Sequence, residues 1–167
     1  MPRPSQRLDI LITPQDVEWQ IDWVGVESLL NSWEDVGATV GDGPGPNVDS
    51  LIKGGFDRIW LERAGKVRLF GNHQGGYYTS CPVTGDNVAA AFQRALLEWR
   101  TGGARALICP SCSETHAFEA LVHRPQIAFA TGAVVLANVQ TAIPEPMLID
   151  ALAAPLGGVR VVHRRVG

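Results

Sequence analysis

Hydrophobic and polar positions alternate over residues 7–13 and the alternation stops at Pro14, which predicts a strand. From Trp23 to Trp33 the apolar residues recur at helical spacing, and Asp22 is placed to cap this helix, which should end before Gly37. Residues 37–55, rich in glycine and proline, predict an exposed, mobile loop. We expect this loop either to recognise a protein partner or to be a tolerated insertion without a role.

The middle of the chain predicts strands followed by a second helix. Residues 56–63 and 66–71 predict a hairpin around Ala64-Gly65, and a strand is expected from about Gly76 to Cys81. Asp86 or Asn87 can cap a helix with an apolar face from Val88 to Trp99, which Gly102-Gly103 would end.

The last third predicts two more helices and three more strands. Residues 104–109 indicate a buried strand, and Ser111 with Glu114 can form a capping box for a short helix that stops before Pro125. Residues 126–139 predict one bent strand or two short ones. Pro146 suits the first turn of a last helix, to about Ala154, and a strand should follow over 158–166.

The order of these elements predicts the fold class. The first block, β-α-β-β-α-β, has the order of a ferredoxin-like sandwich, and α-β-α-β extends it. We therefore expect one α+β domain over residues 1–167, a two-layer sandwich with helices packed on a mixed sheet. Within the final strand, alternation places Arg160 and Arg164 on one face, where they form a charged sheet edge or a small anion or partner patch.

Composition narrows the class of protein. The 167 residues are 46% hydrophobic and 19% charged, which is typical of a globular chain. The net charge of −3 argues against a general nucleic-acid binder. No apolar run approaches the roughly 18 residues that a membrane span needs, and the N-terminus lacks the core of a signal peptide. We expect a cytoplasmic protein, in which cysteines more often bind metal, react or stay inert than form disulfides.

The three cysteines carry the sharpest chemical signal. Cys81 and Cys109 end two strands joined by a helix, so these strands should be parallel and both thiols should lie at one sheet edge. Cys112 follows at a helix start, and His116 should lie one turn further on. Three thiols and an imidazole suggest a tetrahedral structural Zn²⁺ site. For the fourth ligand we expect His116 first, Asp86 second, or a water molecule.

Two short segments resemble the knuckles of zinc ribbons, whose repeated unit is Cys-Pro-x-Cys-Gly. The first knuckle reads Cys81-Pro-Val-Thr84-Gly85, with threonine in place of the family's second cysteine, and the second reads Cys109-Pro-Ser-Cys112-Ser113. A helix separates the two knuckles where zinc ribbons have a hairpin. The resemblance implies a structural zinc ion that Cys81, Cys109 and Cys112 help to hold.

Two other interpretations of the cysteines stay open. Buried free cysteines often only fill a core. Alternatively, a strand followed by Cys109-Pro-Ser-Cys112 resembles the active-site turn of thioredoxin-like proteins, which implies a thiol-disulfide oxidoreductase with Cys109 as its nucleophile. In that family the motif lies near the chain start, whereas here about a hundred residues precede it.

No other pattern points to catalysis. The segment from Gly41 to Pro46 lacks the Lys-Ser/Thr of a P-loop, and no spacing suggests a Ser-His-Asp triad or a pair of catalytic carboxylates. We therefore expect a non-enzymatic protein-interaction or accessory module with a structural zinc site. The alternative is the oxidoreductase that would use Cys109 and Cys112.

Overall fold

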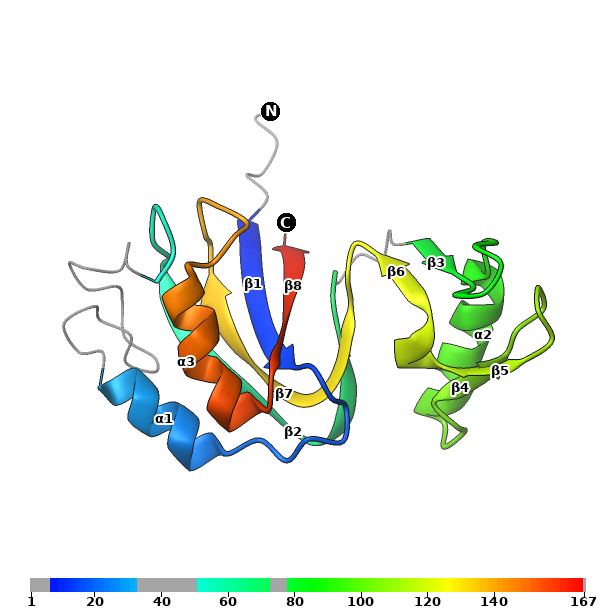
Figure 1. Ribbon diagram of the computed structural model, residues 1–167, viewed down its shortest axis with the longest axis horizontal. Helices are drawn as coiled ribbons and strands as arrows, with labels where there is room; N and C mark the ends of the chain where they lie inside the picture. Colours follow the sequence, from blue (N-terminus) through cyan, green and yellow to red (C-terminus); the bar gives the residue numbers. More distant parts are fainter. Residues whose placement is uncertain (1–6, 33–50, 73–77, 167) are drawn as a thin grey trace. The chain divides into compact units, whose positions relative to one another are not determined.

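The computed structural model describes residues 7–32, 51–72 and 78–166, which form two compact units (Figure 1). The sheet unit comprises Met1–Gly75 and Ile127–Gly167. The inserted unit, Gly76–Gln126, interrupts it between two strands that pair with each other. The sequence analysis placed no boundary at either junction.

The sheet unit contains a four-stranded sheet in the order β2-β7-β1-β8, with every neighbouring pair antiparallel. The sequence analysis expected a mixed sheet instead. Two helices pack on one face of the sheet (Figure 1). The bounds of these elements are β1 Arg7–Pro14, α1 Trp23–Asn31, β2 Arg58–Phe70, β7 Ala128–Ala137, α3 Pro146–Leu156 and β8 Val159–Val166.

The predicted α+β class is confirmed, but the ferredoxin-like order belongs to other elements than expected. It runs β1-α1-β2-β7-α3-β8, so its second half comes from the end of the chain. The sequence analysis assigned that half to residues up to 109, which the structure places in the inserted unit. β1 and β2 are joined through α1 and run parallel, but they are not adjacent, because β7 lies between them and runs the opposite way. Every neighbouring pair is therefore antiparallel.

Local signals in the sequence position both helices of the sheet unit. The Asp22 carboxylate accepts the N–H of Gly25 at 3.0 Å and so caps α1, as predicted. Pro146 occupies the first turn of α3, where a missing N–H costs nothing. The apolar faces of both helices and one sheet face enclose the main core, to which Ile10, Ile12, Val26, Leu30, Val134, Leu136, Leu148, Leu152 and Leu156 belong.

The opposite sheet face is also buried. Leu11, Val135 and Val162 form a second apolar cluster together with Phe70 and Ala128, which lie at the far end of the β2–β7 pair. That pair is long and irregular, with a register shift between Arg63 and Arg68. The predicted hairpin around Ala64-Gly65 is therefore wrong, because residues 58–70 form one continuous strand that pairs with β7.

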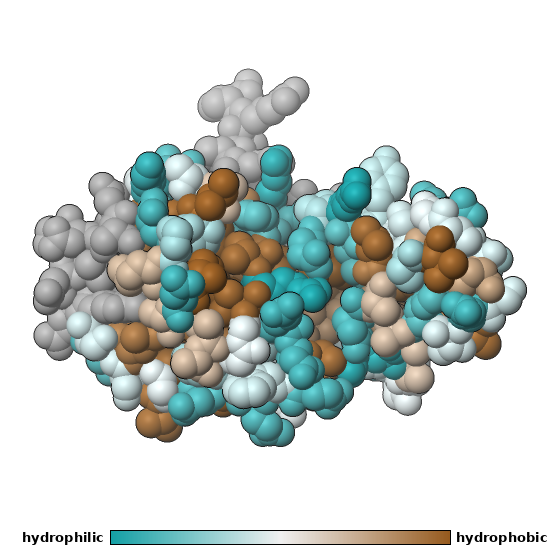
Figure 2. Space-filling view, viewed as in Figure 1, coloured by the Kyte–Doolittle hydropathy of each residue, from teal (hydrophilic) through white to brown (hydrophobic). Residues whose placement is uncertain are grey.

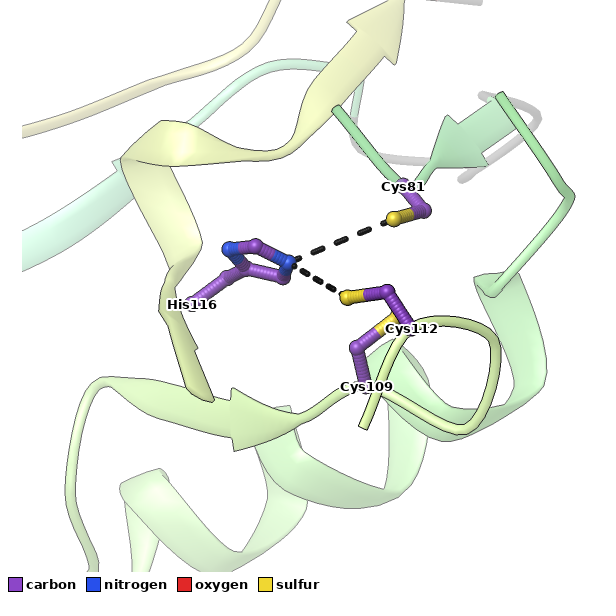
Figure 3. A group of neighbouring side chains, drawn as sticks. All are labelled: Cys81, Cys109, Cys112 and His116. Atoms are coloured by element: carbon purple, nitrogen blue, oxygen red, sulfur yellow. Dashed lines mark hydrogen bonds between the residues drawn. The ribbon is translucent and has the colours of Figure 1, made fainter. Parts of the chain in front are cut away.

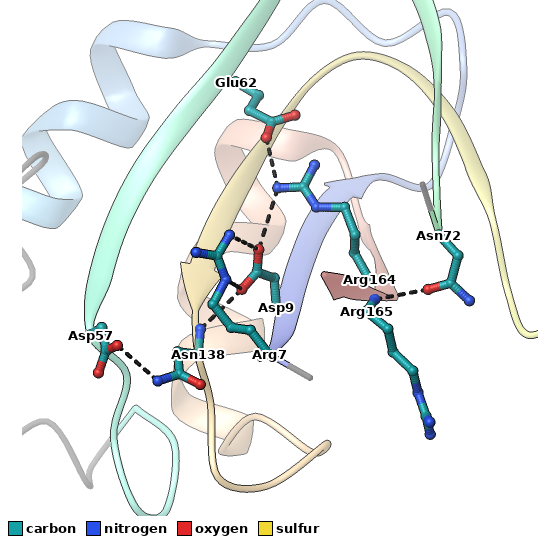
Figure 4. A network of polar contacts seen from close by, with 8 residues as sticks. All are labelled: Arg7, Asp9, Asp57, Glu62, Asn72, Asn138, Arg164 and Arg165. Carbon is teal, nitrogen blue, oxygen red and sulfur yellow. Dashed lines mark hydrogen bonds and ion pairs between the residues drawn. The ribbon is translucent and has the colours of Figure 1, made fainter. Parts of the chain in front are cut away.

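A network of charges lies on the same face (Figure 4). Asp9 is fully buried and pairs with Arg7 at 2.9 Å and with Arg164 at 3.6 Å. The Arg164 guanidinium also donates to Glu62 at 2.8 Å. The last strand is the edge strand that the sequence analysis expected, but Arg164 lies inward in this network.

The predicted loop at 37–55 falls mostly on residues 33–50, which lie outside the described residues. Its last part is not the exposed segment that we expected. Leu51 and Ile52 are fully buried in the main core, so residues 51–52 contribute to packing.

The inserted unit is built from short elements around one helix. Phe92 of this helix packs edge to face on Phe118, with ring centroids 5.1 Å apart, and Trp99 meets Phe118 at 5.9 Å. Two antiparallel strand pairs, β3 with β6 and β4 with β5, complete the unit. The bounds are β3 Tyr78–Ser80, α2 Ala89–Arg100, β4 Ala106–Ile108, β5 Thr115–Ala117, the 3-10 helix η3 Phe118–Ala120 and β6 Val122–Arg124.

The helix predicted after Ser111 and Glu114 is wrong. Ser113 has a φ of 67°, in the left-handed region, so the chain turns back there instead of starting a helix. Residues 115–124 then form β5, η3 and β6.

Exposed apolar side chains occur in both units, and on the face that Figure 2 shows they are interspersed with hydrophilic residues. None of the helices in the described part of the chain is long and apolar enough to cross a membrane.

Candidate metal centre

The second knuckle is the tight turn that joins β4 to β5. The N–H of Cys109 donates to the carbonyl of Glu114 at 2.8 Å, and the N–H of Ser113 donates to the carbonyl of Cys109 at 2.9 Å. These bonds close the turn, and the left-handed Ser113 reverses the chain. Cys109 and Cys112 are thereby held on one side of the turn (Figure 3).

The first knuckle repeats this backbone pattern. The N–H of Cys81 donates to the backbone carbonyl of Asp86 at 2.9 Å, and the N–H of Gly85 donates to the backbone carbonyl of Cys81 at 2.9 Å. Gly85, like Ser113, has a positive φ, here 77°. The two turns therefore match residue by residue, and Thr84 occupies the position that corresponds to Cys112.

His116 reaches the cysteines from a strand. It lies on β5 opposite Leu107 of β4, whereas the sequence analysis placed it on a helix one turn after Cys112. Its Nε2 lies 3.1 Å from the Sγ of Cys112 and 4.0 Å from the Sγ of Cys81 (Figure 3). The His116 side chain thus points toward the thiols, as expected, but from a strand and not from a helix.

Four ligand atoms come together at this point. One atom from each of Cys81, Cys109, Cys112 and His116 lies within 4.8 Å of the others. Ligands of a tetrahedral zinc site are separated by about 3.6–3.8 Å, given Zn–S of about 2.3 Å and Zn–N of about 2.0–2.1 Å. The group can therefore hold one metal ion with only small side-chain movements.

The route by which the cysteines meet is not the predicted one. We expected Cys81 and Cys109 at one edge of a shared parallel sheet. Instead β3 and β4 belong to separate two-stranded sheets, and each thiol projects from its own turn. Both of these thiols are 1% exposed, while Cys112 and His116 are partly exposed.

Hydrogen bonds favour a thiolate at Cys81. The hydroxyl of Thr84 is the main cause that lowers the pKa of Cys81 to about 6, and it acts against burial. The N–H groups of Val83 and Thr84, at 3.4 and 3.5 Å from the sulfur, act in the same direction, as does the thiol of Cys109. A metal ion needs such a deprotonated ligand.

Cys112 behaves differently. The N–H of Glu114 lowers the pKa of Cys112, but burial and the neighbouring thiols of Cys81 and Cys109 together raise it. The three cysteines therefore repel one another as thiolates, and a cation among them would relieve that repulsion.

Polar side chains join the two knuckles beside the cluster. The hydroxyls of Thr84 and Ser111 lie 2.6 Å apart, and Ser111 donates to the Asp86 carboxylate at 2.6 Å. Asp86, our second choice as fourth ligand, is thus engaged outside the group of four. This link was not predicted, although Thr84 at the position of a second cysteine is visible in the sequence.

No known family profile matches the chain, and no curated protein and no solved structure is significantly similar to it.

Proposed function

We propose that Cys81, Cys109, Cys112 and His116 bind one structural Zn²⁺ ion, and that the protein is a non-enzymatic, protein-interacting accessory module of the cytoplasm. The observation that carries this proposal is the convergence of four ligand atoms within 4.8 Å from two matching turns and a strand.

The donor set favours zinc over other metals. Thiolates and imidazole together suit Zn²⁺, and four protein ligands complete its preferred tetrahedral shell. The matching turns also support the resemblance of both knuckles to those of zinc ribbons. With the shell complete, no position remains for a substrate or an activated water, which favours a structural role.

The inserted unit has reason to need such an ion. Units of about 50 residues bury too little apolar surface to be very stable, and metals or disulfides commonly compensate. Here the ion would tie the turn after β3 to the β4–β5 hairpin, which belong to different sheets.

The oxidoreductase alternative has less support. A nucleophilic thiol must be accessible, and Cys109, its nucleophile, is only 1% exposed. The thiol whose pKa hydrogen bonds bring down to about 6 is Cys81, in the other knuckle, while the pKa of Cys112 is raised.

Elemental analysis of protein purified without added metal tests the zinc proposal. We expect one equivalent of zinc, with the three thiols slow to react with a thiol reagent until a chelator is added. Metal far below one equivalent, with all thiols immediately reactive, would overturn the proposal.

A further inference from the structure

A surface hollow of about 490 Å³ lies beside the metal centre, within the inserted unit. Its lining comes from the β3–β6 pair and from Cys81, Pro82 and Gly85 of the first knuckle. Volumes of this size are typical of small-molecule sites. Cys81 thus belongs both to the lining of the hollow and to the group of candidate metal ligands.

Strand register determines which side chains face the hollow. Tyr78 lies directly opposite Arg124, and Ser80 lies opposite Val122. In an antiparallel pair, residues directly opposite each other project from the same face. These four side chains therefore share one face and line the hollow, while Thr79 and His123 between them are buried on the other face.

The lining combines a ring with a single positive charge. Tyr78 is 70% exposed, which is unusual for a large aromatic side chain, and Val122 adds apolar surface that is 40% exposed. Arg124 is exposed, and no acidic side chain in the described part of the chain pairs with it. Among the residues that the structure describes, no acidic one lines the hollow either.

Gly85 leaves room for a ligand against the knuckle. It adopts a positive φ of 77°, and a Cβ built on it would meet nothing within 4 Å. The backbone of the turn is therefore accessible where Gly85 lines the hollow, and a flat group can approach it there.

The charge of the inserted unit limits the ligand class. Residues 76–126 carry four acidic residues, Asp86, Glu98, Glu114 and Glu119, and four arginines, Arg94, Arg100, Arg105 and Arg124. A polyanion gains affinity from many cationic contacts, and a nearly neutral unit with one arginine in the hollow does not supply them. One anionic group beside a flat ring fits this lining.

We propose that the hollow binds a small aromatic compound with one anionic group, whose ring stacks on Tyr78 and whose carboxylate or phosphate pairs with Arg124. The arginine guanidinium donates paired hydrogen bonds to a carboxylate or to a phosphate in the same way. The shared chemistry is therefore one anionic group attached to a planar ring. This inference rests on the lining of the hollow and adds a ligand class to the module proposed above.

Backbone amide NMR of the full chain tests the site with four probes. Benzoate and phenyl phosphate carry both features, benzyl alcohol has only the ring, and inorganic phosphate has only the charge. We expect the amide chemical shifts of Ser80, Gly85 and Val122 to change saturably with benzoate, phenyl phosphate or both. Benzyl alcohol and inorganic phosphate should bind at least tenfold more weakly. The comparison of benzoate with phenyl phosphate shows which anion the site prefers.

Two variants make the test specific. Arg124→Gln should weaken the anionic probes at least tenfold and leave the response to benzyl alcohol unchanged. Arg94→Gln is the matched control, since Arg94 is an exposed arginine of α2 that does not line the hollow. An equal loss in both variants, or shifts that do not saturate, would overturn the proposal. If oligothymidylate bound more strongly than the aromatic probes, with a steep salt dependence, the hollow would be a polyanion site and the proposal would also be overturned.

Metal analysis of the same samples separates this inference from the zinc proposal. Saturable binding to protein that lacks metal would overturn the zinc site alone. One equivalent of zinc without saturable binding would overturn the aromatic-anion site alone.

Discussion

The two units of this protein obtain their order in different ways. In the sheet unit both faces of a four-stranded sheet are buried, one against α1 and α3 and the other in a second apolar cluster. The inserted unit instead has a small group of aromatic rings around Phe118, two short strand pairs and four side chains that could hold a metal ion.

This difference between the two units indicates where polar groups contribute to stability. The sheet unit buries a charge network around Asp9 and Arg164 on the face of the second apolar cluster, while the main apolar core fills the opposite face. In the inserted unit, the turns of the two knuckles hold three thiols and an imidazole close together. We therefore expect the inserted unit to depend on a metal ion and the sheet unit to depend on packing.

The largest expected effect is the response to metal removal. A strong chelator should unfold the inserted unit and leave the sheet unit folded, because structural zinc contributes about 10–16 kcal/mol of apparent binding free energy in small metal-dependent domains. Hydrogen exchange measured by mass spectrometry should show protection lost over 78–124 and retained over β1 and β7.

Added zinc should restore the lost protection. Uniform protection before and after chelation would contradict the comparison, and so would a simultaneous loss in both units.

The next largest effect concerns one ligand. Cys109→Ser removes a buried thiolate with little change in volume, so the melting temperature of the inserted unit should fall by more than about 10 °C, given 4–8 °C per kcal/mol for small domains. Thr84→Ala is the matched control in the other knuckle. Its hydroxyl makes hydrogen bonds near the surface and lowers the pKa of Cys81, but it is not one of the four candidate ligands, so we expect a smaller cost, of about 1–2 kcal/mol.

Scanning calorimetry with metal analysis of both variants makes this comparison. Similar small shifts, with metal content unchanged, would favour cysteines that only fill space.

Elements with a clear period and a cap could be predicted from the sequence. Asp22 and Pro146 mark the starts of α1 and α3, and alternation defines β1 and β8. The grouping of the three cysteines with His116 was also predicted, but only its Cys109-Pro-Ser-Cys112 turn is a local feature, and the approach of Cys81 does not use the parallel sheet that we expected.

Long-range pairing could not be predicted in the same way. Residues 58–70 carry a turn signal at Ala64-Gly65, but β7 lies more than fifty residues further along the chain and pairs with both halves. Likewise, Ser111 and Glu114 match a capping box, while the turn that orients Cys112 requires Ser113 in the left-handed region. In both places the pairing of strands overrides the turn or helix that the local sequence favours.

The third prediction breaks the charge network of the sheet unit. Asp9→Asn leaves Glu62 as the one anionic partner of the buried Arg164 among the described residues, so the free energy of unfolding should fall by about 3–5 kcal/mol. The double variant Asp9→Leu with Arg164→Met should recover much of this loss, since apolar replacements of a buried ion pair are often neutral.

Urea unfolding of the sheet unit, followed by hydrogen exchange at β1, measures both variants, while zinc content reports the inserted unit. A change in zinc content would contradict the separation of the two units. A double variant as unstable as the single one would show that packing at this site requires the original side chains.

The smallest effect tests a single helix cap. In Asp22→Ala the N–H of Gly25 loses its acceptor, which should cost the sheet unit about 1 kcal/mol, within the usual range of about 0.5–2 kcal/mol. Asp22→Asn is the matched control, because asparagine caps nearly as well as aspartate. Thermal unfolding of the sheet unit should therefore shift by a few degrees in the alanine variant and by much less in the asparagine variant. The inserted unit should keep its melting temperature and its metal in both variants, since Asp22 belongs to the other unit. Equal losses in the two variants would mean that the charge of Asp22, and not its cap geometry, stabilises α1.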